Sequence, residues 1–226
     1  MIEQGASVID VGGESTRPGY KMISPEEETD RVAPVIEALK REFDIPVSVD
    51  TYKSSVAEAA LKAGADMVND IHGLLYDEKM ARICKKYDCS VSLMHNRDKV
   101  CYTDLKSEIL EDLQRCISKA KDAGISDDRI ILDPGIGFGK TYEMNLRILN
   151  DLSSFHALGY PLLLGASRKS VIGLALGLPV DQREEGTLVT TVLAVQNHYG
   201  FVRVHDVEKN MRAIRMMKAV QRGCLL

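Results

Sequence analysis

The chain has 226 residues, 45% of them hydrophobic and 27% charged, a composition typical of globular proteins with length enough for a substantial core. Its formal charge of -4 argues against a broad nucleic-acid-binding surface, although a small anionic ligand needs only two or three well-placed cations. No apolar stretch approaches the roughly 20 residues of a membrane helix.

Seven apolar, β-branched runs each end on a polar or charged residue. They cover residues 7–11, 46–50, 67–70, 90–95, 130–133, 161–165 and 201–205. Amphipathic stretches lie between them, and the clearest spans residues 105–120, where apolar residues recur about once per helical turn. This alternation predicts parallel strands joined by helical crossovers. All seven strands would then present their polar ends on one face, where we expect a catalytic site.

The helix ends have recognisable signals. Ser24 is predicted to cap a helix that has Pro25 in its first turn and Glu27 as the second half of a capping box. Pro34 is expected to kink or divide that helix, because it cannot donate a hydrogen bond to the preceding turn. Several glycines are each expected to end a helix in the left-handed conformation: Gly5, Gly64, Gly124, Gly159 and Gly200.

No linker or low-complexity segment interrupts this pattern, so residues 1–226 are predicted to form a single domain. An open doubly wound sheet and a closed (β/α)8 barrel both fit the alternation. Polar residues after nearly every strand favour the barrel, whose site collects all its strand-to-helix loops. The count gives seven of the eight strands, and residues 1–5 look like the last turn of a helix. We therefore expect an α/β (β/α)8 barrel that lacks its first strand and most of its first helix.

The glycine-rich segment 133–141 resembles two phosphate-binding motifs and matches neither. A P-loop requires glycine where Pro134 stands, and a dinucleotide-binding fingerprint requires glycine where Lys140 stands. We interpret the segment as a turn that brings Phe138 and the backbone close to a flat ligand. The alternative is a plain flexible turn.

Asp50, Asn69 and Asp133 each end a strand, and buried polar groups there must find partners. They could pair with helix N-termini. They could instead accept hydrogen bonds from a ligand rich in N–H groups, such as an amino-oxo-pyrimidine ring. Three such groups on three strands favour the ligand.

Cations also follow several strands: Arg17, Lys169, Arg203 and His205. Arginine suits bidentate phosphate recognition, and lysine supplies a compact charge. Their convergence on one face of an otherwise acidic protein suggests a substrate that carries phosphate or pyrophosphate. His95, by contrast, is interpreted as a structural or supporting histidine.

These clusters, in this order, resemble the dihydropteroate synthase family over essentially the whole chain. The most specific segment is Gly-Gly-Glu-Ser-Thr-Arg-Pro-Gly at residues 12–19, and the rest comprises Ser48–Thr51, Asn69–Asp70, Asp133–Lys140, Ser167–Ser170 and Arg203–His205. The resemblance implies a (β/α)8 barrel, usually a homodimer. It also implies a transferase of folate biosynthesis, which joins 6-hydroxymethyl-7,8-dihydropterin pyrophosphate to p-aminobenzoate and is the target of sulfonamides.

The resemblance also implies residue roles. The pterin-binding residues would be Asp50, Asn69, Asp133 and Lys169. The pyrophosphate would be held by Arg203, His205 and Arg17, which with Lys169 make up the catalytic set. Thr16, Pro18, Phe138 and Ser167 would shape the p-aminobenzoate pocket, with residues 15–18 forming a mobile loop over the site.

Two departures from the family pattern stand out. The family's first strand ends in an asparagine that binds Mg²⁺ with the pyrophosphate, and this chain has no equivalent. Mg²⁺ is therefore the expected cofactor, with no metal ligand assigned to the chain. Asn96 also replaces the methionine of the usual Met-His-Met sequence.

Two other functions remain open on the sequence. One is a methyltransferase that moves a methyl group from methyltetrahydrofolate to a corrinoid, and the other is a non-catalytic pterin-binding fragment. We expect small-molecule substrates and neither nucleic acid nor membrane as partner. The five cysteines are odd in number and lack zinc-site spacing, and the start lacks signal-peptide features, so a cytoplasmic protein with reduced thiols is expected.

Overall fold

The computed structural model describes residues 1–15 and 21–223, and these fall into two compact units. The sheet unit comprises residues 7–94 and 113–131, and the C-terminal unit comprises residues 1–6, 95–112 and 132–226. Two elements belong to both units: strand β5 (Ile130–Asp133) and helix α4 (Leu105–Asp122). The prediction of a single domain remains a prediction.

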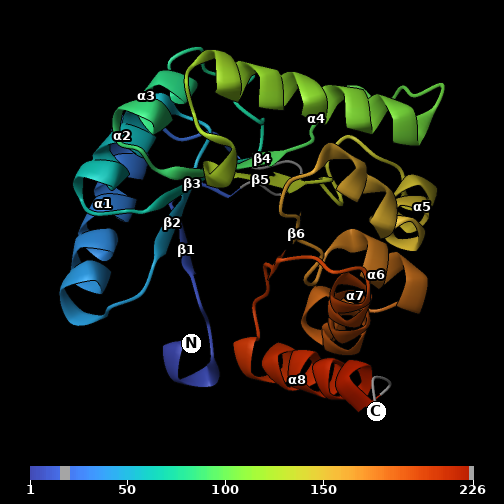
Figure 1. Cartoon of the computed structure of the whole chain (residues 1–226). Coiled ribbons are helices and arrows are strands. Elements are labelled where there is room, and N and C mark those ends of the chain that lie inside the picture. Colours follow the sequence, from blue (N-terminus) through green and yellow to red (C-terminus); the bar gives the residue numbers. More distant parts are fainter. Residues whose placement is uncertain (16–20, 224–226) are drawn as a thin grey trace. The chain divides into compact units, whose positions relative to one another are not determined.

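The sheet unit is built on parallel strands in the order β1-β2-β3-β4-β5 (Figure 1). The first four are β1 (Ile9–Gly12), β2 (Val47–Asp50), β3 (Met67–Asp70) and β4 (Ser90–Met94). Strands β2 and β3 are buried throughout, as apolar strands covered on both faces should be. The register pairs Gly12 with Asp50 and Asp50 with Asn69, so β1 and β2 end level with one another and β3 continues for one more residue.

Helices α1 (Pro25–Glu42), α2 (Ser54–Lys62) and α3 (Met80–Lys86) connect these strands and stack beside them (Figure 1). A short 3-10 helix, Asp127–Arg129, leads into β5. The core of α1 is a stripe of Glu28, Val32 and Ile36, spaced four residues apart on its buried face. One member of that stripe is a carboxylate, which must find a partner inside the unit.

The C-terminal unit pairs strand β6 (Leu163–Leu164) in parallel with β7 (Phe201–Val202), and a bridge between Leu132 and Leu162 joins β5 to the segment before β6. Its helices are α5 (Tyr142–Asn150), α6 (Ser170–Leu176), α7 (Glu184–Gln196) and α8 (Val207–Gly223), with 3-10 helices at Ile2–Gln4, Leu152–Leu158 and Val180–Gln182.

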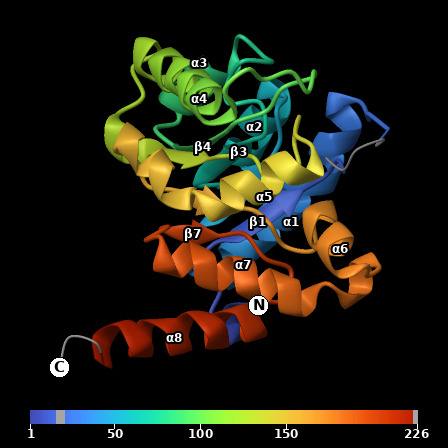
Figure 2. The same cartoon turned by 90° about the vertical axis from the view of Figure 1, so that its right-hand side faces the viewer.

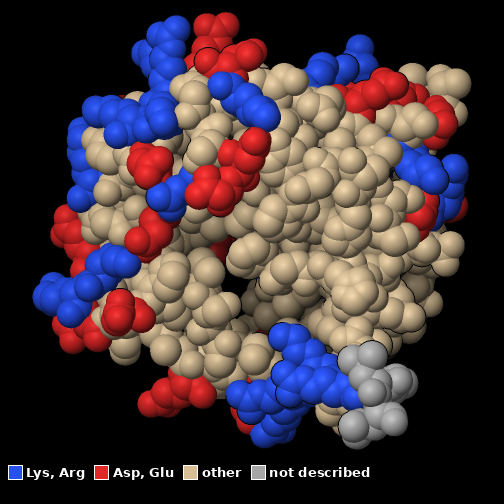
Figure 3. Space-filling model, viewed as in Figure 1, with Lys and Arg blue, Asp and Glu red and all other residues tan. Residues whose placement is uncertain are grey.

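Helices α7 and α8 run side by side (Figure 2). The Thr191 hydroxyl donates to Asn210 Oδ1 at 2.6 Å between them, and both residues are buried. The outer face of α8 is basic, and Figure 3 shows Lys and Arg gathered over it. The basic residues of this helix are Lys209, Arg212, Arg215, Lys218 and Arg222. Within the described part of the chain, no helix is both long and apolar enough to cross a bilayer.

The predicted cap of the first long helix is confirmed, because the backbone N–H of Glu27 donates to Ser24 Oγ at 3.1 Å. The Glu27 carboxylate instead accepts from Arg31 at 2.5 Å. Pro34 was expected to kink or divide this helix, and a division is wrong, since α1 continues unbroken from Pro25 to Glu42. Pro34 lies on the exposed side of the helix, where water can satisfy the carbonyl it leaves unpaired, while Val32 and Ile36 hold the opposite side in the core.

The left-handed conformation is confirmed at Gly5, Gly64, Gly124 and Gly159. It is not found at Gly200, where the prediction is wrong. The turn after α7 comes earlier, and His198 adopts the left-handed conformation with φ 57°. The backbone N–H of Tyr199 then bonds to the carbonyl of Ala194 at 3.0 Å, which closes the helix before the glycine is reached.

The predicted alternation of parallel strands and helices is confirmed. Each of the seven predicted runs contains or overlaps one of the seven strands formed by the described residues. The runs at 67–70 and 130–133 match their strands completely, while the last two shrink to two residues each. In both of these the polar residues at the carboxyl end lie beyond the strand, in the loops.

Candidate functional site

In the sheet unit, Asp50 and Asn69 lie side by side at the ends of β2 and β3. They are paired in register, and Asn69 Nδ2 donates to Asp50 Oδ1 at 3.4 Å. Both are buried, with 5% and 6% of their surface exposed. The parallel strands direct both side chains to the same end of the sheet.

A buried ionic cluster lies beside the end of β1 in the same unit. Lys53 Nζ, at the start of α2, contacts Glu14 Oε2 at 2.8 Å and Glu28 Oε2 at 2.7 Å. Glu14 also accepts from the Tyr52 hydroxyl at 2.6 Å and from the backbone N–H of Ile23 at 2.7 Å. Burial alone would raise the pKa of Glu14, but the hydrogen bonds from Lys53, Tyr52 and Ile23 together outweigh it and lower the pKa. The Glu14 carboxylate therefore links the end of β1 to Ile23, in the segment that precedes α1.

In the C-terminal unit, Asp133 ends β5 and is 4% exposed. Its Oδ1 accepts from the backbone N–H of Gly135 at 2.7 Å. Burial raises the pKa of this carboxyl, and the charges of Lys169, Lys140 and Arg203 oppose that rise together with the Gly135 N–H. The carboxylate thus sits in a cationic surrounding, prepared to accept hydrogen bonds from a ligand.

Lys169 stands at the start of α6, half-buried, with extended backbone at the cap position. Its Nζ donates to the carbonyl of Ile136 at 2.5 Å and lies 4.6 Å from the centre of the Phe138 ring. A side chain at Gly165 would come 3.4 Å from Asp133 Oδ2 and 3.8 Å from Lys169 Nζ. The carboxylate and the ammonium thus both lie within van der Waals reach of the position where a side chain at Gly165 would begin.

Ser167 and His205 form a second pair in this unit. Ser167 Oγ lies 2.9 Å from His205 Nδ1, and the backbone N–H of His205 donates to the same oxygen at 3.3 Å. Arg203 follows β7, where its backbone N–H bonds to the carbonyl of Leu164 at 3.0 Å. Arg203 and His205 are both exposed, as groups that bind a charged ligand from solvent must be.

The structure therefore groups the predicted residues within each unit. Asp50 and Asn69 meet in the sheet unit, and the C-terminal unit brings Asp133 near Lys169, Lys169 near Phe138, and Ser167 near His205. Thr16, Arg17 and Pro18 lie outside the described residues. The role of each residue remains a prediction.

Sequence reasoning missed a buried network in the C-terminal unit. His95 Nε2 lies 3.0 Å from Asp112 Oδ2, and Lys140 Nζ lies 2.8 Å from His95 Nδ1. One signal could have revealed it. Asp112 falls on the apolar stripe of its helix, seven residues after Leu105 and four before Cys116, where a carboxylate must have a buried partner.

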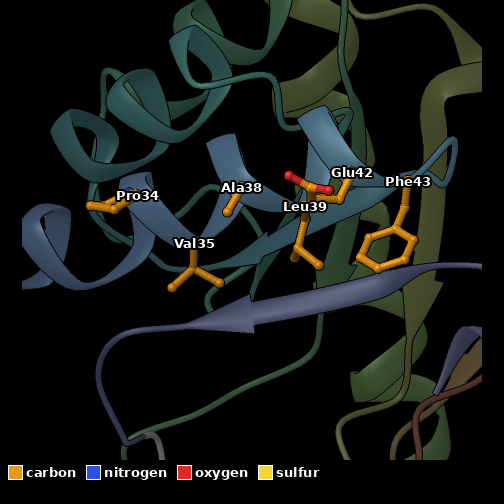
Figure 4. A pocket seen from close by; sticks show the side chains of 6 residues that line it. All are labelled: Pro34, Val35, Ala38, Leu39, Glu42 and Phe43. Carbon is orange, nitrogen blue, oxygen red and sulfur yellow. The ribbon is translucent and has the colours of Figure 1, made fainter.

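A pocket of about 350 Å³ lies along α1 (Figure 4). Its lining consists of Pro34, Val35, Ala38, Leu39, Glu42 and Phe43. Only Glu42 is polar, so the pocket offers little chemistry. It includes none of the predicted site residues.

Comparison with known proteins identifies the family. The pattern of the pterin-binding enzymes matches residues 1–205. The dihydropteroate synthase of Clostridium beijerinckii is 57% identical over 223 residues, which span 98% of this chain and 83% of the relative. The chain belongs to the dihydropteroate synthase family. Its enzyme class is accordingly that of a transferase.

Two solved structures extend the likeness to the fold. A dihydropteroate synthase from Clostridium difficile, solved in the presence of pteroic acid, has a TM-score of 0.95 and 49% identity, and covers 97% of this chain and 84% of its own. The Yersinia pestis enzyme in complex with a sulfonamide drug has a TM-score of 0.94 and 38% identity, with 98% and 82% covered. The prediction of a (β/α)8 barrel rather than an open doubly wound sheet is confirmed. Of the two enzyme activities left open, the comparisons support the synthase.

Proposed function

We propose that the chain condenses 6-hydroxymethyl-7,8-dihydropterin pyrophosphate with p-aminobenzoate, giving 7,8-dihydropteroate and pyrophosphate. The observation that carries the proposal is the grouping of the buried Asp133 carboxylate and the Lys169 ammonium around Gly165, with the Phe138 ring next to the ammonium. This is a site for a flat ligand with N–H groups, in a chain of the dihydropteroate synthase family.

In this proposal the pterin ring is read by carboxylate and amide groups. Asp133 would accept from ring N–H groups, and Lys169 would donate to a ring acceptor. Asp50 and Asn69 supply the same chemistry from the sheet unit. The buried carboxylates also stabilise positive charge on the pterin when the leaving group departs.

The exposed cations would hold the pyrophosphate. The C–O bond of the substrate breaks, and its electron pair leaves with the pyrophosphate. Arg203 and His205 stabilise the charge that develops there, and Arg17 is the third cation proposed for this task. The p-aminobenzoate nitrogen then attacks the exocyclic carbon, forms the C–N bond and loses a proton. No covalent enzyme intermediate is required.

Phe138 and Ser167 would shape the p-aminobenzoate pocket, together with Thr16 and Pro18. Phe138 offers a ring face for stacking, and Ser167, held by His205, is a hydroxyl near the carboxylate end of the substrate. Sulfonamides resemble p-aminobenzoate in shape and would compete for the same pocket.

Mg²⁺ remains a proposal that rests on the resemblance. Among the described residues, no group of three or more His, Cys, Asp and Glu side chains could hold a metal ion. The described residues therefore show no such cluster of metal ligands, and no step of the proposed reaction depends on a metal ion. A homodimer is likewise proposed from the resemblance, and a cytoplasmic location from the cysteine content and the start of the sequence. Cys84, Cys89, Cys101 and Cys116 form no disulfide, which fits a reducing compartment.

The first test is direct product formation. The chain is incubated with both substrates and Mg²⁺, and dihydropteroate is detected by chromatography, with and without a chelator. We expect product, and a loss of about 100-fold or more in kcat/KM for Asp133→Asn. Asp122→Asn, on the exposed end of α4, is the matched control and should retain wild-type activity. A folded wild-type chain that binds pterin but never yields product would overturn the proposal.

A further inference from the structure

The sequence of the loop between β5 and α5 does not by itself restrict the loop to one backbone conformation. Gly135, Gly137 and Gly139 adopt left-handed φ angles of 71°, 86° and 59°. Three glycines within five residues leave the backbone free to sample many shapes. Yet this loop carries Phe138, the ring proposed to face p-aminobenzoate, so something must select one conformation.

Lys140 makes that selection from inside the loop. Its Nζ donates to the carbonyls of Gly135 and Phe138, both at 2.9 Å, and contacts His95 Nδ1 at 2.8 Å. In the protonated form of Lys140, these three partners use the three N–H donors of the ammonium, although burial lowers the pKa of this lysine to about 7. The carbonyls of Gly135 and Phe138 lie on opposite sides of Gly137 in the sequence, so one side chain bonds to both halves of the loop.

His95 holds the lysine in place from the other side. Its side chain is fully buried, and its two ring nitrogens have different partners: Lys140 at Nδ1 and Asp112 at Nε2. Burial, reinforced by the charge of Lys140, lowers the pKa of His95 to about 3, so the ring is neutral near pH 7. A neutral ring that accepts at Nδ1 carries its proton at Nε2, where it donates to Asp112.

Asp112 anchors the chain of contacts to α4. Its Oδ2 also accepts from Arg97 Nε at 2.6 Å, and Arg97 reaches Glu108 one turn earlier at 2.6 Å. The segment after His95 touches the loop directly as well. A side chain at Gly139 would come 2.3 Å from the carbonyl oxygen of Arg97, and Tyr102 donates to the carbonyl of Gly139 at 2.9 Å.

A buried network of ionisable groups fills space at a higher cost in free energy than an apolar cluster would. Burying ionisable groups carries a desolvation penalty that well-packed apolar residues avoid. The network instead fixes the orientation of its side chains, because a hydrogen bond requires one geometry whereas apolar contacts allow several. That distinction points to a role in fixing the loop.

We propose that Lys140 and His95 are positioning residues, which fix the loop of residues 135–139 and so place Phe138 for p-aminobenzoate. The proposal rests on the proposed function for its substrate. It makes a claim about loop geometry that can be measured without any substrate.

The chain contains no tryptophan, so Phe138→Trp creates a single fluorescent reporter in the loop. In this background we compare Lys140→Met with Lys106→Met, which breaks an exposed ion pair to Asp151. Acrylamide quenching should rise about threefold or more with Lys140→Met and stay unchanged with the control, provided circular dichroism shows both folded. Equal quenching in the two folded variants would overturn the proposal.

His95 offers a sharper comparison, which also holds if Lys140→Met fails to fold. Asparagine places an acceptor near Nδ1, and glutamine places a donor near Nε2. His95→Asn should therefore keep the lysine contact and leave acrylamide quenching of the tryptophan at its low value. His95→Gln should keep only the Asp112 contact, and quenching should rise as it does with Lys140→Met. Identical quenching in both variants would show that the lysine contact does not govern the loop.

Kinetics then connects the loop to the reaction. In the chain with Phe138 intact, Lys140→Met should raise KM for p-aminobenzoate about tenfold and change KM for the pterin substrate less than about twofold. If the wild-type chain makes no dihydropteroate, the proposed function fails while the fluorescence results still stand. If it does, and both KM values move together, the positioning role fails alone.

Discussion

At the scale of single residues, Asp70 is a buried carboxylate that supports a loop and should make the stability of the protein depend on pH. It ends β3 and accepts from the backbone N–H groups of His72 and Leu74, both at 2.8 Å. Leu74 adopts a left-handed φ of 69°, which is unfavourable for a branched residue and requires support. Burial raises the pKa of Asp70 to about 6, against the effect of both N–H donors.

This raised pKa predicts a specific dependence of stability on pH. A carboxyl whose pKa is higher in the folded state binds its proton more tightly there, so its contribution is fully present below about pH 4 and lost as pH rises through about 6. The stability of the wild type relative to Asp70→Asn should fall by up to about 3 kcal/mol between pH 4 and pH 7. Urea unfolding at four pH values measures it, with Asp122→Asn as the exposed control. A difference that is flat across this range would contradict the assignment.

Single residues also mark what a sequence can reveal about a site. Asp50, Asn69 and Asp133 could be singled out because each ends an apolar strand, a position with a clear physical meaning. The Glu14–Lys53 contact could not, because its partners are 39 residues apart and only the fold brings them together. Lys140 was noticed only as a failed motif, since its true partners are backbone carbonyls that no residue pattern encodes.

At the scale of elements, Lys53, Glu14 and Glu28 join β1, α1 and α2. Lys53 Nζ also donates to the carbonyl of Ile23 at 2.8 Å, so one ammonium satisfies two buried carboxylates and a loop carbonyl. The two carboxylate side chains are only 2% and 1% exposed. Removing the lysine would leave both without their cation inside the protein.

Lys53→Met should therefore lower the free energy of unfolding by about 3–5 kcal/mol. Adding Glu28→Gln should cost less than the sum of the single changes, with a coupling of about 1–3 kcal/mol. Lys62→Met is the matched control, because its pair with Glu58 is exposed and 3.7 Å long, and it should cost less than about 1 kcal/mol. Urea denaturation of the four variants and the wild type provides the cycle. Additive changes would show that the three charges do not act as a unit.

Element boundaries were predictable where strands are buried on both faces and uncertain elsewhere. Residues 67–70 and 130–133 are short buried runs that begin with apolar residues and end on a carboxylate, and both strands match them. The run at 161–165 shrinks to Leu163–Leu164, because Pro161 has no N–H for the ladder and Gly165 has no side chain to pack. Gly200 failed as a helix end because the same turn can close on His198, a choice decided by local hydrogen bonds.

At the scale of the whole molecule, the sequence predicted parallel strands joined by helices, because alternating strands and helices allow few topologies. The division of the chain into two compact units was not visible in it. No composition shift or linker marks the boundary, which passes through the middle of α4 and of β5.

That boundary leads to a prediction about unfolding. Residues 105–112 of α4 belong to the C-terminal unit and the rest of the helix to the sheet unit. Helices are cooperative, and a frayed half would expose apolar residues such as Leu113, so neither unit can unfold without destabilising an element of the other. Phe43→Trp reports on the sheet unit and Phe201→Trp on the C-terminal unit, each as the sole tryptophan. Both fluorescence transitions in urea should coincide with the loss of circular dichroism. Two separated midpoints would instead show that the units are independent domains, against the single domain expected from the sequence.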